Sequence, residues 1–159
     1  MTVERDKTLL LSDDDLLKEC RFDRMRGTGP GGQKRNKTES CVRLTHLPTG
    51  LVATDDVSRS QHTNRENALR KLRFSLALSL REPFAAPPLQ GEPTNQQLPL
   101  WLAHAFDALA EAEWQVAPAA KQMQCTTSHF LKLIAKSTVA WQRLVAERQA
   151  RNLPPLSQK

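Results

Sequence analysis

Residues 41–54 read CVRLTHLPTGLVAT, and they contain the clearest fold signal in the chain. Over residues 41–47, polar and apolar side chains nearly alternate, as they do in a half-buried β-strand. Residues 48–50 then supply proline, threonine and glycine, which favour a tight turn, and residues 51–54 return as a second strand. The stretch therefore predicts a β-hairpin.

The sequence on both sides of the hairpin adds helices and one more strand. Ser12 precedes three aspartates, which is typical of the N-cap and first turn of a short helix. Residues 21–25 alternate like a strand, and residues 58–81 have the period of a long helix. We expect this helix to pack on the hairpin around a core of Val42, Leu44, Leu51, Leu69, Leu72 and Leu76. The predicted fold class is α+β.

The C-terminal part of the chain has a different composition. Residues 82–99 hold five of the ten prolines and little periodicity, which predicts a linker between a domain at residues 1–81 and a helical module at residues 100–159. Five of the eight aromatic residues lie in the module, as expected of a folded core. Its short helix, tight turn and capped second helix outline a helix-turn-helix, and a plain helical bundle explains the same pattern.

The positive charge of the chain is concentrated in its middle segment. Lys and Arg exceed Asp and Glu by 6, and residues 21–81 alone carry a net charge of +8. Residues 1–20 carry −3 and residues 82–159 carry +1. This distribution favours an anionic partner such as nucleic acid or an acidic lipid surface.

Composition also bears on the compartment. No apolar run approaches the length of about 18 residues that a membrane span needs, so we expect no membrane insertion. The first 20 residues hold six acids and three bases, which matches neither a secretory signal nor a mitochondrial presequence. Cys20, Cys41 and Cys125 form no CxxC pair, which is typical of reduced thiols. We therefore expect a cytoplasmic protein.

Several familiar catalytic patterns do not occur in the sequence. It contains no HExxH motif, no Cys/His cluster at zinc spacing and no GxxxxGK[ST] phosphate loop. The four histidines lie far apart, with no evident nucleophile beside any of them. We therefore predict no metal and no cofactor, and any catalysis must use a modest group.

Residues 31–33, the triplet Gly31-Gly32-Gln33, supply such a group. Two adjacent glycines permit backbone angles that are closed to other residues, so the following amide and side chain can enter a narrow space. The Gln33 side chain can orient a water molecule, and its backbone N–H can stabilise a developing oxyanion. Residues 24–38 around the triplet hold five bases and no acid, and four of the six glycines of the chain.

Three blocks of sequence resemble the catalytic domain of class I peptide chain release factors. They are RGTGPGGQ at residues 26–33, NKTES with VRLTHLPTG at residues 36–40 and 42–50, and RSQHTNR at residues 59–65. The resemblance implies a small α+β domain that presents a GGQ loop to the ribosomal peptidyl transferase centre and hydrolyses peptidyl-tRNA. It implies that Gly31, Gly32 and Gln33 are catalytic and that a methyltransferase modifies the Gln33 amide.

The implied partners are the ribosome, through its rRNA, and peptidyl-tRNA. Basic side chains near the three blocks are candidates for contacts with RNA phosphates. They are Arg24, Arg26, Lys34, Arg35, Lys37, Arg59 and Arg65.

The sequence departs from the release-factor pattern in two respects. Lys34 and Arg35 replace a small polar residue or histidine and an apolar residue, which removes a packing anchor and adds charge where rRNA is expected. Neither the PxT nor the SPF tripeptide of stop-codon recognition occurs. The chain therefore resembles the short, codon-independent members that rescue stalled ribosomes, although these commonly end in a basic tail rather than a helical module.

Two other functions remain open at this stage. Loss of the packing anchor at Arg35 is compatible with a ribosome-binding module that has no catalytic activity. The C-terminal helices are compatible with a DNA-binding regulator. Against the regulator, residues 128–136 of the candidate recognition helix hold only two bases, Lys132 and Lys136.

Overall fold

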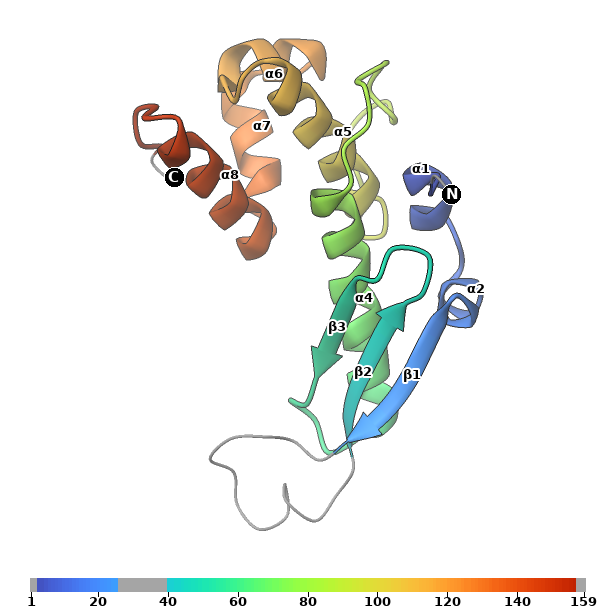
Figure 1. Ribbon diagram of the computed structural model, residues 1–159. Helices are drawn as coiled ribbons and strands as arrows, with labels where there is room; N and C mark the ends of the chain where they lie inside the picture. Colours follow the sequence, from blue (N-terminus) through green and yellow to red (C-terminus); the bar gives the residue numbers. More distant parts are fainter. Residues whose placement is uncertain (1–2, 26–39, 157–159) are drawn as a thin grey trace. The chain divides into compact units, whose positions relative to one another are not determined.

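Three antiparallel strands form a sheet in the order β1-β2-β3 (Figure 1). The structure is a computed structural model, and it describes residues 3–25 and 40–156. The strands are β1 (Cys20–Met25), β2 (Cys41–His46) and β3 (Val52–Asp55). The chain divides into two units, Met1–Leu76 and Ala77–Lys159, and the division falls within helix α4 (Gln61–Ser79). The α+β prediction is confirmed.

The predicted hairpin is present as β2 and β3. Its register pairs Val42 with Asp55 and Leu44 with Ala53. Gly50 adopts a φ of 77°, which favours glycine, and its N–H donates to the His46 carbonyl at 2.6 Å. The tight turn therefore fixes the register of the two strands.

Helix α4 lies along one face of the sheet (Figure 1). The core of the first unit combines Val42, Leu44 and Ala53 from the sheet with Ala68, Leu69, Leu72 and Leu76 from α4, all of them buried. Leu51 is only half-buried, so its prediction as a core residue is wrong. It precedes β3, whose alternation places Ala53 and Asp55 on the buried side.

Two short helices precede the sheet. In α2 (Asp13–Lys18), the Ser12 hydroxyl accepts a hydrogen bond from the Asp15 N–H at 3.1 Å, which confirms the predicted N-cap. Helix α1 (Arg5–Leu9) was not predicted from the sequence. The Arg73 side chain joins these helices to α4 by donating to the carbonyls of Leu9 and Leu11 and to the Asp13 carboxylate.

The second unit contains four further helices, α5 (Leu98–Glu111), α6 (Val116–Gln122), α7 (Thr127–Ile134) and α8 (Thr138–Ala150). Aromatic side chains form much of its core, with ring centroids 5.6 Å apart for Trp101 and Phe130 and 5.9 Å apart for Phe106 and Trp114. Within the described residues, no helix is both long enough and apolar enough to cross a membrane.

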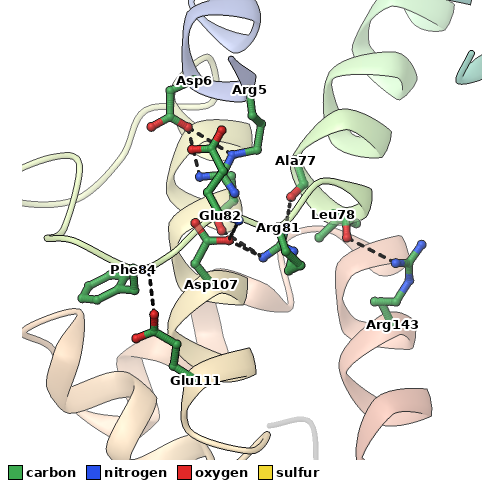
Figure 2. Close-up of polar contacts among 11 residues, drawn as sticks. Arg5, Asp6, Ala77, Leu78, Arg81, Glu82, Phe84, Asp107, Glu111 and Arg143 are labelled. Carbon is green, nitrogen blue, oxygen red and sulfur yellow. Dashed lines mark hydrogen bonds and ion pairs between the residues drawn. The ribbon is translucent and has the colours of Figure 1, made fainter. Parts of the chain in front are cut away.

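Residues 80–97 contain neither helix nor strand, yet their first part is held against α5 (Figure 2). The Asp107 carboxylate lies 3.0 Å from the Arg81 guanidinium and accepts from the Glu82 N–H at 3.1 Å. Glu111 accepts from the Phe84 N–H at 2.9 Å. The start of the proline-rich segment is therefore part of the packing around α5.

Candidate functional site at the ends of the 26–39 segment

The predicted site residues fall into two groups. Most of them lie outside the described residues, namely Gly31, Gly32 and Gln33 with the basic side chains Arg26, Lys34, Arg35 and Lys37. The second group consists of Arg24, Arg59 and Arg65, which are described. Met25 and Ser40, the residues on either side of the 26–39 segment, are described as well. The geometry given below is therefore that of the residues next to the 26–39 segment, which form the base of the site.

The described residues on either side of this segment lie next to each other at one end of the sheet. Met25, the last residue of β1, is paired with Cys41, the first residue of β2. Since the two strands are antiparallel neighbours, the chain leaves the sheet and returns to it at adjacent positions.

Asn64 lies at the point of return and is fully buried. Its Nδ2 donates to the carbonyls of Ser40 and Ser58, both at 2.8 Å, and its Oδ1 accepts from the Ser58 N–H at 2.9 Å. These bonds connect the start of β2 with the approach to α4. Sequence reasoning assigned no role to Asn64, because a polar residue in the first turn of a helix is usually exposed.

The first turn of α4 lies at the same end of the sheet. The Ser60 hydroxyl accepts from the Thr63 N–H at 3.2 Å, and the Gln61 side-chain oxygen lies 3.5 Å from the Arg24 guanidinium. Residues 61–64 include no acid. The positive end of the helix dipole therefore adds to the cationic side chains around it.

The three described basic candidates surround this helix end. Arg24 and Arg59 are exposed, and Arg65 is half-buried with its guanidinium 3.0 Å from the His62 Nδ1. An Arg nitrogen must donate in this contact, so Nδ1 accepts, and the Nε2 of His62 faces Glu66 at 3.0 Å. The arrangement presents cations where a phosphate backbone could approach.

Two other bases on α4 have partners within the fold. Lys71 lies 2.8 Å from the Asp55 carboxylate and also donates to the Thr54 carbonyl. Arg73 is bound to the helices before the sheet, and its side chain is only 14% exposed. Lys71 and Arg73 are therefore less available to an anionic partner than the sequence of α4 predicts.

Asp55 is a buried carboxylate beneath this surface. Burial by itself raises the pKa of Asp55, but hydrogen bonds from Lys71 and Asn67 and the charge of Lys71 outweigh it and hold the pKa below its usual value. The ionised carboxylate thus ties the end of β3 to the middle of α4.

His46 lies at the other end of the hairpin, away from the paired Met25 and Cys41. Its ring is buried, which lowers the pKa despite a Glu19 carboxylate 3.6 Å from Nε2. The Thr49 hydroxyl forms a hydrogen bond of 2.7 Å with Nδ1 and accepts from the Leu51 N–H. This histidine holds the turn and has no part in the site.

A model of the RF-1 domain family matches residues 15–96, just over half of the chain. The chain belongs to the RF-1 domain family. The matched range includes the sheet, α4 and all of the predicted site residues, and it ends two residues before α5 begins at Leu98.

Curated relatives agree with this membership. The chain is 48% identical over 63 residues to peptide chain release factor 1 of Xylella fastidiosa, and 50% identical over 64 residues to that of Acetivibrio thermocellus. Each alignment covers 40% of this chain and 18% of the relative. Peptide chain release factor 2 of Paramagnetospirillum magneticum is 45% identical over 80 residues, covering 48% of this chain and 21% of the relative. The chain thus spans about a fifth of the length of the release factors it matches.

Proposed function

We propose that this chain hydrolyses the ester bond of peptidyl-tRNA at the peptidyl transferase centre of the ribosome. The observation that carries the proposal is the Gly31-Gly32-Gln33 triplet inside the range matched by the RF-1 domain family. The adjacent ends of the segment and the cations beside them support it. Names of the relatives, peptide chain release factor 1 and 2, point to the same reaction.

In the proposed reaction, water attacks the ester carbonyl carbon of peptidyl-tRNA. The bond between that carbon and the tRNA ribose oxygen breaks, and one proton of the water converts this oxygen to a hydroxyl. The other proton passes to solvent, so the peptide leaves as a carboxylate. The Gln33 side chain orients the water, and a backbone N–H stabilises the oxyanion. Gly31 and Gly32 give the backbone the freedom to place these groups.

The basic side chains give the affinity for the ribosome in this proposal. Arg24, Arg59 and Arg65 flank the start of α4, and Arg26, Lys34, Arg35 and Lys37 belong to the segment itself. Contacts between such cations and rRNA phosphates are independent of base sequence and sensitive to salt. The reaction takes place on cytoplasmic ribosomes, and a methyltransferase acting on the Gln33 amide is a second partner.

The proposed activity is independent of a stop codon. No PxT or SPF tripeptide occurs in the sequence, which favours rescue of stalled ribosomes over codon-directed termination. The domain arrangement in this proposal is a catalytic domain at residues 1–81, a linker at residues 82–99 and a module at residues 100–159 that docks on ribosomal RNA or protein.

The decisive experiment is release of labelled peptide from ribosomes stalled without a stop codon. We expect Gly32→Ala, which restricts the backbone, and Gln33→Ala, which removes the side chain that orients the water, to reduce the release rate by on the order of 10²-fold, the scale of a misplaced reacting group. Co-sedimentation should show ribosome binding close to that of the unaltered chain. An equal loss of binding and release would contradict a catalytic role for the triplet.

One observation favours a second candidate, a ribosome-binding module without catalytic activity. Lys34 and Arg35 follow the triplet where the family has a small polar residue or histidine and an apolar residue. The same assay separates the candidates, since a binding module co-sediments with ribosomes and releases no peptide. Adding a stop codon to the mRNA then tests codon independence.

A further inference from the structure

The Asn64 side chain uses three hydrogen bonds within a fully buried environment. Both Nδ2 hydrogens meet carbonyl oxygens, and Oδ1 meets an N–H, so the orientation of the amide is fixed by its partners. Water does not compete for these bonds, and an unsatisfied group left in their place would be costly. Asn64 therefore connects three backbone groups, the N–H and carbonyl of Ser58 and the carbonyl of Ser40.

Two of the three bonds are local and one is not. Both bonds to Ser58 close a turn just before α4, within six residues of Asn64. The bond to the Ser40 carbonyl crosses 24 residues and reaches the residue immediately before β2. It fixes the backbone where the 26–39 segment rejoins the fold, one residue from the Met25–Cys41 pair.

We propose that Asn64 is a positioning residue for peptide release, acting through the Ser40 carbonyl on the chain that carries Gly31, Gly32 and Gln33. This inference rests on the proposed function. A displacement of about 1 Å at a reacting group can cost on the order of 10²-fold in rate. Loss of the Nδ2 donors therefore lowers the rate of the chemical step, whereas the cations Arg24, Arg59 and Arg65 lie outside the segment and keep their contacts with RNA.

Other side chains cannot reproduce this connection. Aspartate has the size of asparagine and can accept from the Ser58 N–H, but it offers no donor to the two carbonyls. Serine offers a single donor on a shorter side chain. Asn64→Asp and Asn64→Ser thus remove the bond to Ser40 in two different ways.

Arg73 provides a matched control for the loss of hydrogen bonds. Its guanidinium also makes three contacts within the same unit, to the carbonyls of Leu9 and Leu11 and to Asp13. These contacts fix the helices before the sheet and none of them involves the start of β2. Arg73→Met therefore destabilises the unit without touching the return of the segment.

The test measures single-turnover peptide release across protein concentrations, with the folded fraction of each variant taken from urea denaturation at the assay temperature. For Asn64→Asp and Asn64→Ser we expect the maximal rate per folded molecule to fall about 10- to 100-fold, on the scale set by misplaced groups. The half-saturating concentration should stay within about twofold. Arg73→Met should retain the unaltered maximal rate per folded molecule.

The outcomes separate this inference from the proposed function. If the unaltered chain releases no peptide, the proposed function fails. The positioning role is overturned if the unaltered chain releases peptide and the Asn64 variants have the same maximal rate per folded molecule. It is also overturned if their maximal rate falls no further than that of Arg73→Met. Should Asn64→Asp not fold, Asn64→Ser in a stabilising osmolyte, compared with the unaltered chain in the same osmolyte, decides the result.

Discussion

Both units bury polar side chains, but among the described residues the fully buried aromatic side chains belong to the second unit. In the first unit, Thr8, His46, Asp55 and Asn64 are buried polar residues with hydrogen bonds to other elements or to nearby backbone. In the second, Trp101, Phe106, Trp114 and Phe130 form an aromatic core, and the buried polar residues Asp107, Ser137 and Arg148 are hydrogen-bonded as well. A buried polar group costs free energy unless it is hydrogen-bonded, whereas burying aromatic area is itself stabilising. Both units therefore use buried polar contacts to fix positions, and the second adds the stability of a buried aromatic core.

The family match extends past the first unit, because it also covers residues 77–96 of the second. It ends at residue 96, and the helices α5 to α8 begin after it. The polar contacts at the base of the segment therefore belong to the part of the chain shared with release factors. The aromatic core belongs to the remainder, for which we propose docking rather than catalysis.

The largest expected effect on stability comes from Phe106→Ala. The Phe106 side chain is 1% exposed and its ring meets that of Trp114, so truncation should lower the free energy of unfolding by about 3–5 kcal/mol. All three tryptophans lie in the second unit, so tryptophan fluorescence during urea denaturation reports that unit. The release rate per folded molecule should stay unchanged. A large fall in that rate would break the distinction between the units.

Leu72→Ala makes the corresponding change in the first unit. Leu72 is fully buried on α4, so we expect a loss of about 2–5 kcal/mol, measured as hydrogen exchange of the β2 amides. Leu51→Ala is the matched control, because the same truncation at a half-buried position should cost clearly less. Equal costs would contradict the burial of the two side chains. If Leu72→Ala also shifts the fluorescence transition by the same amount, the two units unfold together.

The sequence predicts most of the elements because their signals are local. Alternation across residues 41–54 specifies the hairpin, and the Ser12 cap specifies α2. Helix α1 has only five residues, too few for a periodic signal, and was missed. Leu51 shows a similar limit of sequence patterns. It lies just before β3, which begins at Val52, and the pattern does not predict where the strand begins.

The polar contacts could not be predicted, because each joins residues far apart in the chain. Asp55 reaches Lys71, Arg73 reaches Asp13, and Asn64 reaches Ser40. In the sequence, the two bases simply add to a basic helix and the asparagine is unremarkable. The triplet Gly31-Gly32-Gln33, for which we propose the catalytic role, is the reverse case, because its sequence context is specific while it lies outside the described residues.

A smaller effect follows from the pKa of Asp55, which hydrogen bonds and the charge of Lys71 hold below its usual value despite burial. The folded-state pKa is thus lower than the unfolded value of about 3.9, so the carboxylate stabilises the fold above that pH. This stability is lost as the pH falls through the folded-state pKa. We expect Asp55→Asn to flatten the decline of the urea midpoint below about pH 4. The same change at exposed Asp14 is the control, and an equally flattened profile there would contradict the role of Asp55.

The smallest expected effect concerns the salt dependence of ribosome binding. Arg59 and Arg65 flank the start of α4, where no acid occupies the first turn, whereas Lys136 on the second unit lies 3.5 Å from the Glu92 carboxylate. Each cation that neutralises a phosphate adds about 0.7–0.9 to the slope of log affinity against log salt. Arg59→Ala and Arg65→Ala should therefore each reduce the magnitude of the slope by nearly one and leave peptide release at saturation unchanged.

Lys132→Ala supplies the comparison in the second unit, since Lys132 is an exposed base of α7, the helix that a DNA-binding regulator would use. If cations of the first unit bind the phosphates, Lys132→Ala leaves the slope for ribosome binding unaltered. The same titration with duplex DNA should give weak binding that Lys132→Ala does not change. If Lys132→Ala reduces the slope as much as Arg59→Ala does, the second unit shares the phosphate contacts, and the division between a catalytic, cationic unit and a stabilising, nearly neutral one no longer holds.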